Sequence, residues 1–182
     1  IEERLVEKTD EIIMYEPSVF EPEYDEFLKS VKTAFALSDW MDEEDEDYIL
    51  KNYNITPGEL HYKKDLCDWM LYATEELARL LALKKQLKDI RKTKYRLKKG
   101  VKEELIPLVR LKNIGRVRAR KLFRNGIKDI KSIKKTTYSE LSQLIGKKTA
   151  KKIKEQVGQE VDIEPVSKKK RKGQMGLGKY KN

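Results

Sequence analysis

The chain has 182 residues, of which 38% are hydrophobic and 40% are charged, so it can hold one large or two small domains with a very polar surface. A single cysteine, Cys67, excludes an internal disulfide, and a single histidine, His61, leaves too little for a zinc site or a histidine-dependent triad; we predict no metal site. No apolar run approaches the ~18 residues of a membrane span, and the start, residues 1–4, is not a signal peptide, so we expect a cytoplasmic protein without membrane partners.

The charge is divided along the chain. Residues 1–83 carry 8 Lys and Arg against 22 Asp and Glu, a net charge of −14, whereas residues 84–182 carry 33 against 9, a net charge of +24. The second half is therefore predicted to bind a polyanion, and the first half is not predicted to do so through net charge.

The first part of the chain is predicted to be helical. Residues 1–20 suggest a short, loosely apolar helix followed by an extended stretch. From Glu23, apolar residues recur at helical spacing, which predicts a core-facing helix; they include Tyr24, Phe27, Val31 and Phe35. The acidic run 42–47 is interpreted as the solvated start of another helix, where carboxylates favour the helix dipole.

A long helix is predicted from Thr56-Pro57-Gly58-Glu59, a capping box with proline at the first position, to about Leu83. Its expected buried stripe comprises Leu66, Met70, Ala73, Leu77 and Leu81. A second face carries Tyr62 and Trp69, two turns apart. These aromatic side chains either stack on unpaired bases or fill a bundle core, and the spacing leaves both interpretations open.

A basic amphipathic helix is predicted over residues 84–99, ended by Gly100. The central motif follows at residues 108–127, L-V-R-L-K-N-I-G-R-V-R-A-R-K-L-F-R-N-G-I. An apolar run ends at Gly115 and a new helix begins at once, its first turns crowded by Arg116, Arg118, Arg120 and Arg124. Free amides at a helix start and the positive end of the helix dipole attract anions, so this hairpin is predicted to hold a phosphate.

The same arrangement recurs at L-I-G-K-K-T-A, where Gly146 precedes Lys147 and Lys148. In both copies an alanine, Ala119 or Ala150, stands four residues after the glycine. Two such units resemble a tandem helix-hairpin-helix domain. The plainer interpretation is two ordinary helix pairs with solvated lysines.

No strand-like alternation of any length occurs, so the fold class is predicted to be all-α: a helical bundle over 1–104, a small helix-hairpin-helix DNA-binding domain over 105–164, and a basic tail over 165–182 that stays disordered until bound. Within the tail, Gln174, Leu177 and Tyr180 have the spacing of a sliding-clamp peptide. Clamp binding is the weaker hypothesis because only one aromatic residue is present.

Four segments together resemble the C-terminal portion of archaeal Holliday-junction-migration (Hjm-type) helicases, which are superfamily-two DNA helicases. They are F-L-K-S-V-K-T-A-F-A-L-S-D-W (27–40), I-T-P-G-E-L with D-W-M-L-Y-A (55–73), R-L-K-K-G-V-K-E-E-L (96–105) and I-G-R-V-R-A-R (114–120). The resemblance implies a "ratchet" bundle in which Trp69 stacks on a translocating base, with Tyr62 in place of the basic residue of the family. It also implies that Arg116, Arg118 and Arg120 form a motif associated with strand binding and braking.

The chain contains neither the phosphate-binding loop G-x-x-x-x-G-K-[ST] nor a D-E-x-H motif, so it is expected neither to bind ATP productively nor to unwind DNA alone. ATP and Mg are expected in the parent motor. We expect the chain to be a single-stranded-DNA-binding accessory region of an ATP-dependent 3′-5′ DNA helicase that acts at forks. Its expected partners are single-stranded or forked DNA and the motor domains of the same protein, and its expected location is the cytoplasm, in association with the nucleoid. The alternatives are a free-standing DNA adaptor or clamp-recruiting module, and an RNA-binding protein.

Overall fold

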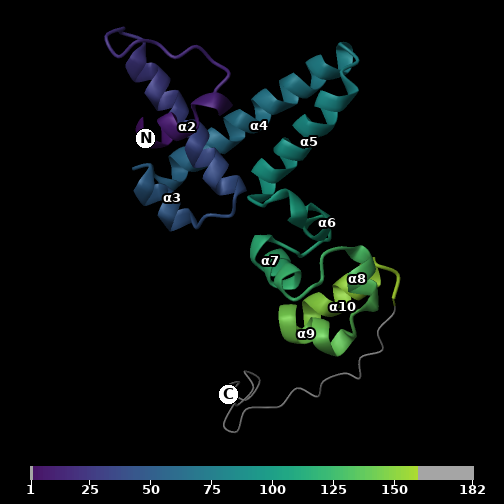
Figure 1. Cartoon of the computed structure of the whole chain (residues 1–182). Helices are drawn as coiled ribbons and strands as arrows, with labels where there is room; N and C mark the ends of the chain where they lie inside the picture. The colour runs from purple at the N-terminus through teal and green to yellow at the C-terminus, as the bar shows by residue number, and fades with distance from the viewer. Residues whose placement is uncertain (1, 160–182) are drawn as a thin grey trace, which may run out of the picture.

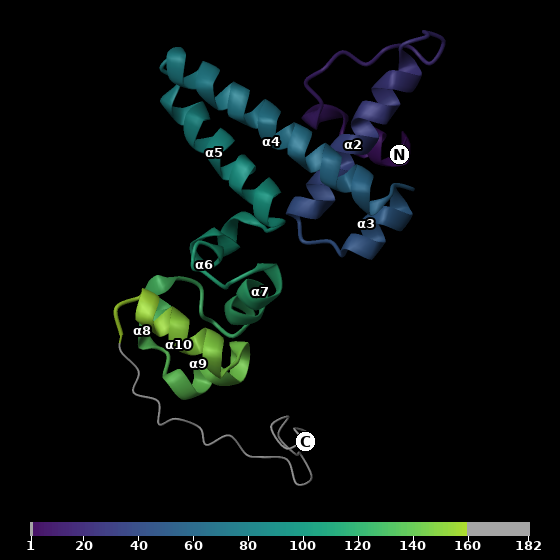
Figure 2. The ribbon, with the colours of Figure 1, turned by 180° about the vertical axis from the view of Figure 1, so that it is seen from behind.

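The computed structural model describes residues 2–159. Within that range every regular element is helical, which confirms the all-α class (Figure 1). A bundle is followed by a group of short helices, and the view from behind shows the same order (Figure 2). The elements are α1 (Glu2–Glu7), η1 (Thr9–Glu11), α2 (Tyr24–Met41), α3 (Glu46–Asn52), α4 (Pro57–Leu80), α5 (Lys84–Lys99), η2 (Glu103–Leu105), α6 (Ile106–Val109), α7 (Arg116–Arg124), α8 (Ile130–Lys135), α9 (Tyr138–Ile145) and α10 (Lys147–Gln156).

Helices α4 and α5 form a long antiparallel hairpin that projects from the bundle (Figure 1). The start of α4 is the predicted capping box, since Thr56 accepts a hydrogen bond from the Glu59 amide and the Glu59 carboxylate accepts one from the Thr56 amide. Helix α4 ends at Leu80, and Ala82 adopts a left-handed backbone with φ 55° as the chain reverses. Gly100 ends α5, as predicted, with φ 60°.

The bundle core forms where α2, α3 and α4 meet the last turn of α5. Phe27, Val31 and Phe35 point into it from α2, as the helical spacing predicted. They are joined by buried side chains from the neighbouring helices, including Ile49, Leu60 and Leu97. Burial of these apolar side chains, worth roughly 1.5–3 kcal/mol each, holds the base of the projecting hairpin.

A buried ionic network ties α1 to this bundle. Arg4 donates hydrogen bonds from both terminal nitrogens to the Asp39 carboxylate, at 2.6 and 2.9 Å, and the Tyr53 hydroxyl donates to Asp39 at 2.6 Å. Burial alone would raise the pKa of Asp39, but the hydrogen bonds from Arg4 and Tyr53 outweigh it, and the pKa lies below its ordinary value. The network therefore favours the ionised carboxylate in the folded state.

The sequence predicted a buried apolar stripe on the long helix α4, but most residues of that stripe are exposed. Leu66, Met70, Leu77 and Leu81 are 45%, 56%, 59% and 67% exposed. The bundle instead uses an adjacent side of α4, where Leu60 and Ala78 are buried. Helical spacing identified an apolar face correctly, but no element within residues 2–159 covers it.

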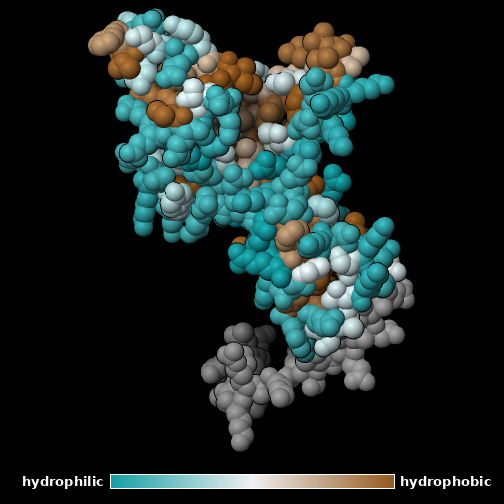
Figure 3. Space-filling model, in the orientation of Figure 1, coloured by the Kyte–Doolittle hydropathy of each residue, from teal (hydrophilic) through white to brown (hydrophobic). Residues whose placement is uncertain are grey.

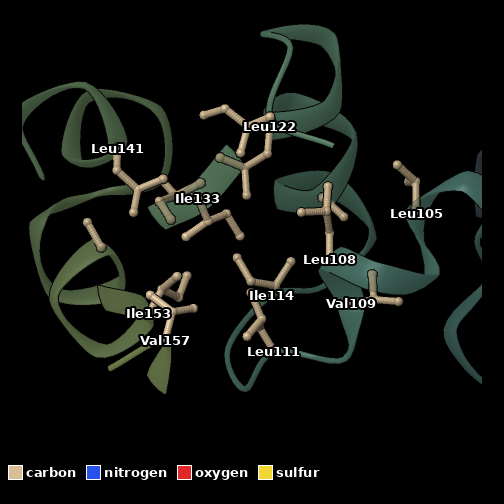
Figure 4. Packing of buried hydrophobic residues seen from close by; sticks show 14 of the residues in the cluster. Leu105, Leu108, Val109, Leu111, Ile114, Leu122, Ile133, Leu141, Ile153 and Val157 are labelled. Atoms are coloured by element: carbon tan, nitrogen blue, oxygen red, sulfur yellow. The ribbon is translucent and has the colours of Figure 1, made fainter. Parts of the chain in front are cut away.

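The second unit is built around the two hairpins predicted from the sequence, one between α6 and α7 and one between α9 and α10. Ala119 and Ala150 are both fully buried, so each small residue lies at a close helix contact. Around them, leucine, isoleucine and valine side chains from α6 to α10 converge on one core (Figure 4). Gly126, with φ 79°, closes α7 through a left-handed turn.

Substituting Asp39 by Asn is expected to lower the free energy of unfolding by about 2 kcal/mol at neutral pH, because hydrogen bonds to charged groups contribute about 1.5–3 kcal/mol and Arg4 is partly exposed. A depressed folded-state pKa stabilises the protein above the unfolded-state value of 3.8, and this contribution is lost as the pH falls through the lower, folded-state value. Urea unfolding at neutral and acid pH measures both effects. The exposed Asp10→Asn variant is the control; an equal loss in that variant, or an unchanged acid dependence in Asp39→Asn, contradicts the prediction.

Candidate nucleic-acid interface

The outward face of α4 carries the aromatic residues singled out from the sequence. Tyr62 and Trp69 are 67% and 65% exposed and lie on the same side of the helix. Leu66 and Met70 stand between and beside them, also exposed. Trp69 therefore does not fill the core of this bundle, and the core-filling interpretation is wrong for residues 2–159.

Hydrophobic surface continues to the far end of the α4–α5 hairpin. Leu80, Leu81 and Leu83 are 82%, 67% and 41% exposed, and the space-filling view shows hydrophobic side chains gathered at this outer end (Figure 3). A patch of this kind marks an interaction surface more often than a random surface does. The α4 face thus combines flat aromatic rings with aliphatic side chains.

The first hairpin turns at Asn113 rather than at Gly115. Asn113 has φ 70°, in the left-handed region, whereas Gly115 is extended with φ −97° and ψ −178°. A Cβ added at Gly115 would meet no heavy atom within 4 Å, so packing does not require glycine there. The missing side chain leaves open space at the start of α7, whose first amides have no side-chain cap.

The second hairpin differs in this respect. Gly146 has φ 86°, a conformation that favours glycine, and it caps both α9 and α10. Lys147 and Lys148 follow it as exposed side chains at the start of α10. This hairpin therefore needs its glycine for the turn, and it presents ammonium groups beside uncapped amides.

The arginines of α7 divide into two sets. Arg118 and Arg124 are exposed, and Arg118 donates a hydrogen bond to the carbonyl of Asn113 in the hairpin turn at 3.1 Å. Arg116 and Arg120 instead point toward the bundle. Arg116 and Arg120 are four residues apart and share a helix face, whereas Arg118 faces away. Arg124 continues the face of Arg116 and Arg120 to the exposed end of α7, where it lines a groove with Glu43.

Arg120 is held by carboxylates from both sides of the junction. Its guanidinium donates to Glu43 at 2.6 and 2.7 Å and to Glu104 at 3.0 Å. Glu43 also accepts a hydrogen bond from the Lys102 amide at 2.9 Å. Burial would raise the pKa of Glu43, but the hydrogen bonds from Arg120 and Lys102 outweigh it, and the pKa lies below its ordinary value.

Arg116 lies against Trp40 at the same junction. Its guanidinium carbon is 4.9 Å from the ring centroid, and it donates to the Glu44 carbonyl at 3.0 Å. The Lys64 ammonium from α4 lies 3.8 Å from the Trp40 ring, and burial lowers the pKa of Lys64. Trp40 itself donates to the Leu97 carbonyl at 2.7 Å, so the indole links α2, α4, α5 and α7.

Sequence reasoning missed this junction. The acidic run 42–47 was interpreted as a solvated helix start, whereas Glu43 is largely buried and binds Arg120. The available signal was the reversal of charge between the two halves of the chain, which allows acidic residues of the bundle to pair with arginines of α7. The spacing within either segment does not reveal that pairing.

The structure thus brings Tyr62 and Trp69 together on α4, and it places Gly115 and Arg118 at the start of α7 and Arg124 at its end. Lys147 and Lys148 stand at the second hairpin, and Arg116 and Arg120 stand at the junction. The sliding-clamp residues Gln174, Leu177 and Tyr180, and the basic tail, lie outside the described residues. Over residues 2–159, no helix has the length and apolar character required to cross a bilayer.

The junction generates a prediction of its own. Glu43→Gln is expected to weaken the contact between the bundle and α7 by about 2 kcal/mol, because it removes the charge that faces a largely buried guanidinium. The radius of gyration from small-angle X-ray scattering should rise as the two units separate. Glu44→Gln is the matched control, since Glu44 contacts Arg116 through its backbone carbonyl only. Equal radii for the two variants would show that the Glu43 charge does not hold the units together.

Comparison with known proteins accounts for both units. Residues 1–100 match the family described as archaeal helicase, domain 4, and residues 105–158 match the SAM-like helix-hairpin-helix tandem. Among curated relatives, the ATP-dependent DNA helicase Hel308 of Caldivirga maquilingensis is 41% identical over 82% of this chain and 20% of its own length. The helicases of the same name from Thermococcus kodakarensis and Methanocaldococcus jannaschii are 41% and 43% identical over 88% and 73% of this chain.

The chain spans a fifth or less of these relatives, namely 20%, 14% and 11% of their lengths. The first family model covers more than half of the chain, and the relatives agree with it. The resemblance drawn from the sequence is confirmed: this chain belongs to the archaeal Hel308 helicase family, as its domain 4 joined to a helix-hairpin-helix tandem.

Proposed function

We propose that this chain is the single-stranded-DNA-binding accessory region of an ATP-dependent 3′-5′ DNA helicase that acts at forks, where it grips and brakes the translocating strand. The observation that carries the proposal is the exposure of Trp69 and Tyr62 on one face of α4, in a chain of a DNA-helicase family. The motor domains of the same protein supply ATP and Mg chemistry. We place the protein in the cytoplasm, beside the nucleoid.

Stacking on α4 is the proposed grip. An unpaired base can lie flat against the exposed indole of Trp69, and such a stack contributes ~1–3 kcal/mol whatever the base. Tyr62 offers a second ring two turns earlier, so the helix can hold successive bases as the strand moves. Contacts of this kind suit a motor, because they resist slipping without selecting a sequence.

Phosphate contacts at the hairpins complete the proposed site. Arg118 is exposed in the first turn of α7, close to the open backbone at Gly115, and Arg124 is exposed at the other end of that helix. Lys147 and Lys148 stand at the corresponding place on α10. The net charge of +24 over residues 84–182 favours any anionic strand, and the exposed cations at uncapped helix starts give it defined positions.

Braking is proposed to act through Arg116 and Arg120. Both are engaged by the bundle, Arg120 through Glu43 and Glu104 and Arg116 through Trp40 and the Glu44 carbonyl. A phosphate that competes with Glu43 for Arg120 would exchange one charge-assisted contact for another, at a small net cost. The hairpin unit can then shift between the bundle and the strand, which slows the strand while it is bound.

Trp69→Ala is expected to weaken binding of oligothymidine to the whole chain about 5- to 150-fold, the equivalent of ~1–3 kcal/mol for one lost stack. The salt dependence of binding should not change, because the indole carries no charge. Fluorescence anisotropy over a salt series measures both quantities. Trp69→Phe should restore most of the affinity, and Tyr15→Ala, an exposed aromatic outside α4, is the control. Wild-type affinity in Trp69→Ala would remove α4 from the proposed site.

Arg118→Gln is expected to reduce the slope of log affinity against log salt by about 0.7, the value for one phosphate contact to a single strand. The exposed Lys29→Gln variant loses the same charge from the bundle and should keep the wild-type slope. The same anisotropy titrations provide the measurement. An unchanged slope in Arg118→Gln shows that this arginine does not contact phosphate.

A further inference from the structure

A groove of about 590 Å³ lies between α5 and the segment formed by η2 and α6. It belongs neither to the aromatic face of α4 nor to the starts of α7 and α10. Its polar lining is almost entirely cationic, with Glu103 as the one acidic residue. The side chains that matter for its chemistry are Lys84, Lys88, Arg91, Lys92, Arg110 and Tyr95.

Helical spacing explains why the cations gather. Lys84, Lys88 and Lys92 lie at intervals of four residues, so they line one side of α5 in steps of about 6 Å. Arg91 lies on the same side, and Arg110 reaches the groove from the end of α6. Side chains at such intervals can meet successive phosphates of an extended strand.

Most of this charge is not neutralised by the protein. Lys92 pairs with Glu103 at 2.9 Å, and Arg91 pairs with Glu75 at 2.8 Å. Lys84, Lys88 and Arg110 have no carboxylate within 4.0 Å among residues 2–159. Like charges around one concavity repel one another, and a bound polyanion relieves that repulsion.

The floor of the groove is apolar and rigid. Leu87, Ile106 and Pro107 line it, and the half-buried ring of Tyr95 stands beside them. The Tyr95 hydroxyl donates to the Val109 carbonyl at 3.2 Å, which fixes the ring. A floor of this kind can receive a sugar or a base edge while the cations on the rim hold the phosphates.

We propose that this groove is a second single-stranded-DNA site, which binds the sugar-phosphate backbone along α5 and passes the strand toward the first hairpin. The inference rests on the proposed function, because it extends the path of the same strand. Continuity supports the direction: Arg110 directly follows α6, and the chain runs from it into the turn of the first hairpin at Asn113. A single strand fits a concave apolar floor, whereas a duplex would contact only the rim.

The test compares two double variants of the whole chain that lose equal charge. Lys84→Gln with Lys88→Gln removes two exposed cations of the groove, and Lys51→Gln with Lys85→Gln removes two exposed cations outside it. With a long oligothymidine, the groove variant should bind several-fold more weakly and lose about 1.4 units of salt slope, for two phosphate contacts. The control variant should keep the wild-type slope.

Binding of a short oligothymidine and the Trp69→Ala variant distinguish the groove proposal from the proposed stacking on α4. The groove variant should bind the short oligonucleotide as the wild type does, because α4 and the hairpins suffice for it. If Trp69→Ala has no effect but the groove variant still fails with the long oligonucleotide, the α4 site is wrong and the groove site stands. If the groove variant matches the control at both lengths, the groove proposal is overturned.

Amide chemical shifts give a direct measurement. Titration with the long oligothymidine should shift α5 and η2 resonances around Lys88 and Glu103 in the wild type, and should not shift them in the groove variant. Poly-glutamate is the competing probe. If poly-glutamate binds the groove more tightly than an oligothymidine of equal charge, the site is one for acidic protein and the DNA proposal is overturned.

Discussion

Glu43 holds the two units of this protein together. Its carboxylate binds Arg120 of α7 and the amide of Lys102, so one side chain on the turn between α2 and α3 fixes both the exit of α5 and the first long helix of the hairpin unit. Trp40 stands beside it and contacts Lys64 and Arg116. These contacts, together with Tyr95 of α5, which packs against the hairpin core and donates to the Val109 carbonyl, orient the hairpins relative to α4.

Local rules predicted the parts of the fold that depend on neighbouring residues. The capping box at Thr56 and the helix end at Gly100 were predicted because each depends on residues at the helix end itself. Spacing also predicted the core face of α2. It was wrong for α4, since an apolar stripe at Leu66 and Met70 shows that something covers the face, without showing that the cover lies within this chain.

Local sequence patterns were equally limited in predicting the candidate site. Motif reasoning singled out Arg116, Arg118 and Arg120 as one group, but which of them faces solvent depends on where Glu43 lies in space. These arginines are more than seventy positions from Glu43 in the sequence, and no local sequence pattern spans such a separation. The turn of the first hairpin is formed by Asn113 and not by Gly115. The backbone conformation does not require glycine at position 115, and the missing side chain leaves the backbone there accessible.

The division of charge along the chain now has a structural consequence. An acidic bundle beside a basic hairpin unit gives one arginine of α7, Arg120, a carboxylate partner in Glu43. DNA phosphate and Glu43 are chemically similar partners for Arg120, since each offers two oxygens to a planar guanidinium. Under the proposed braking role, exchange between these two partners would let strand tension or a step of the motor release the contact. An exchangeable ionic contact suits the proposed brake, whereas a buried apolar junction would not release the hairpin unit.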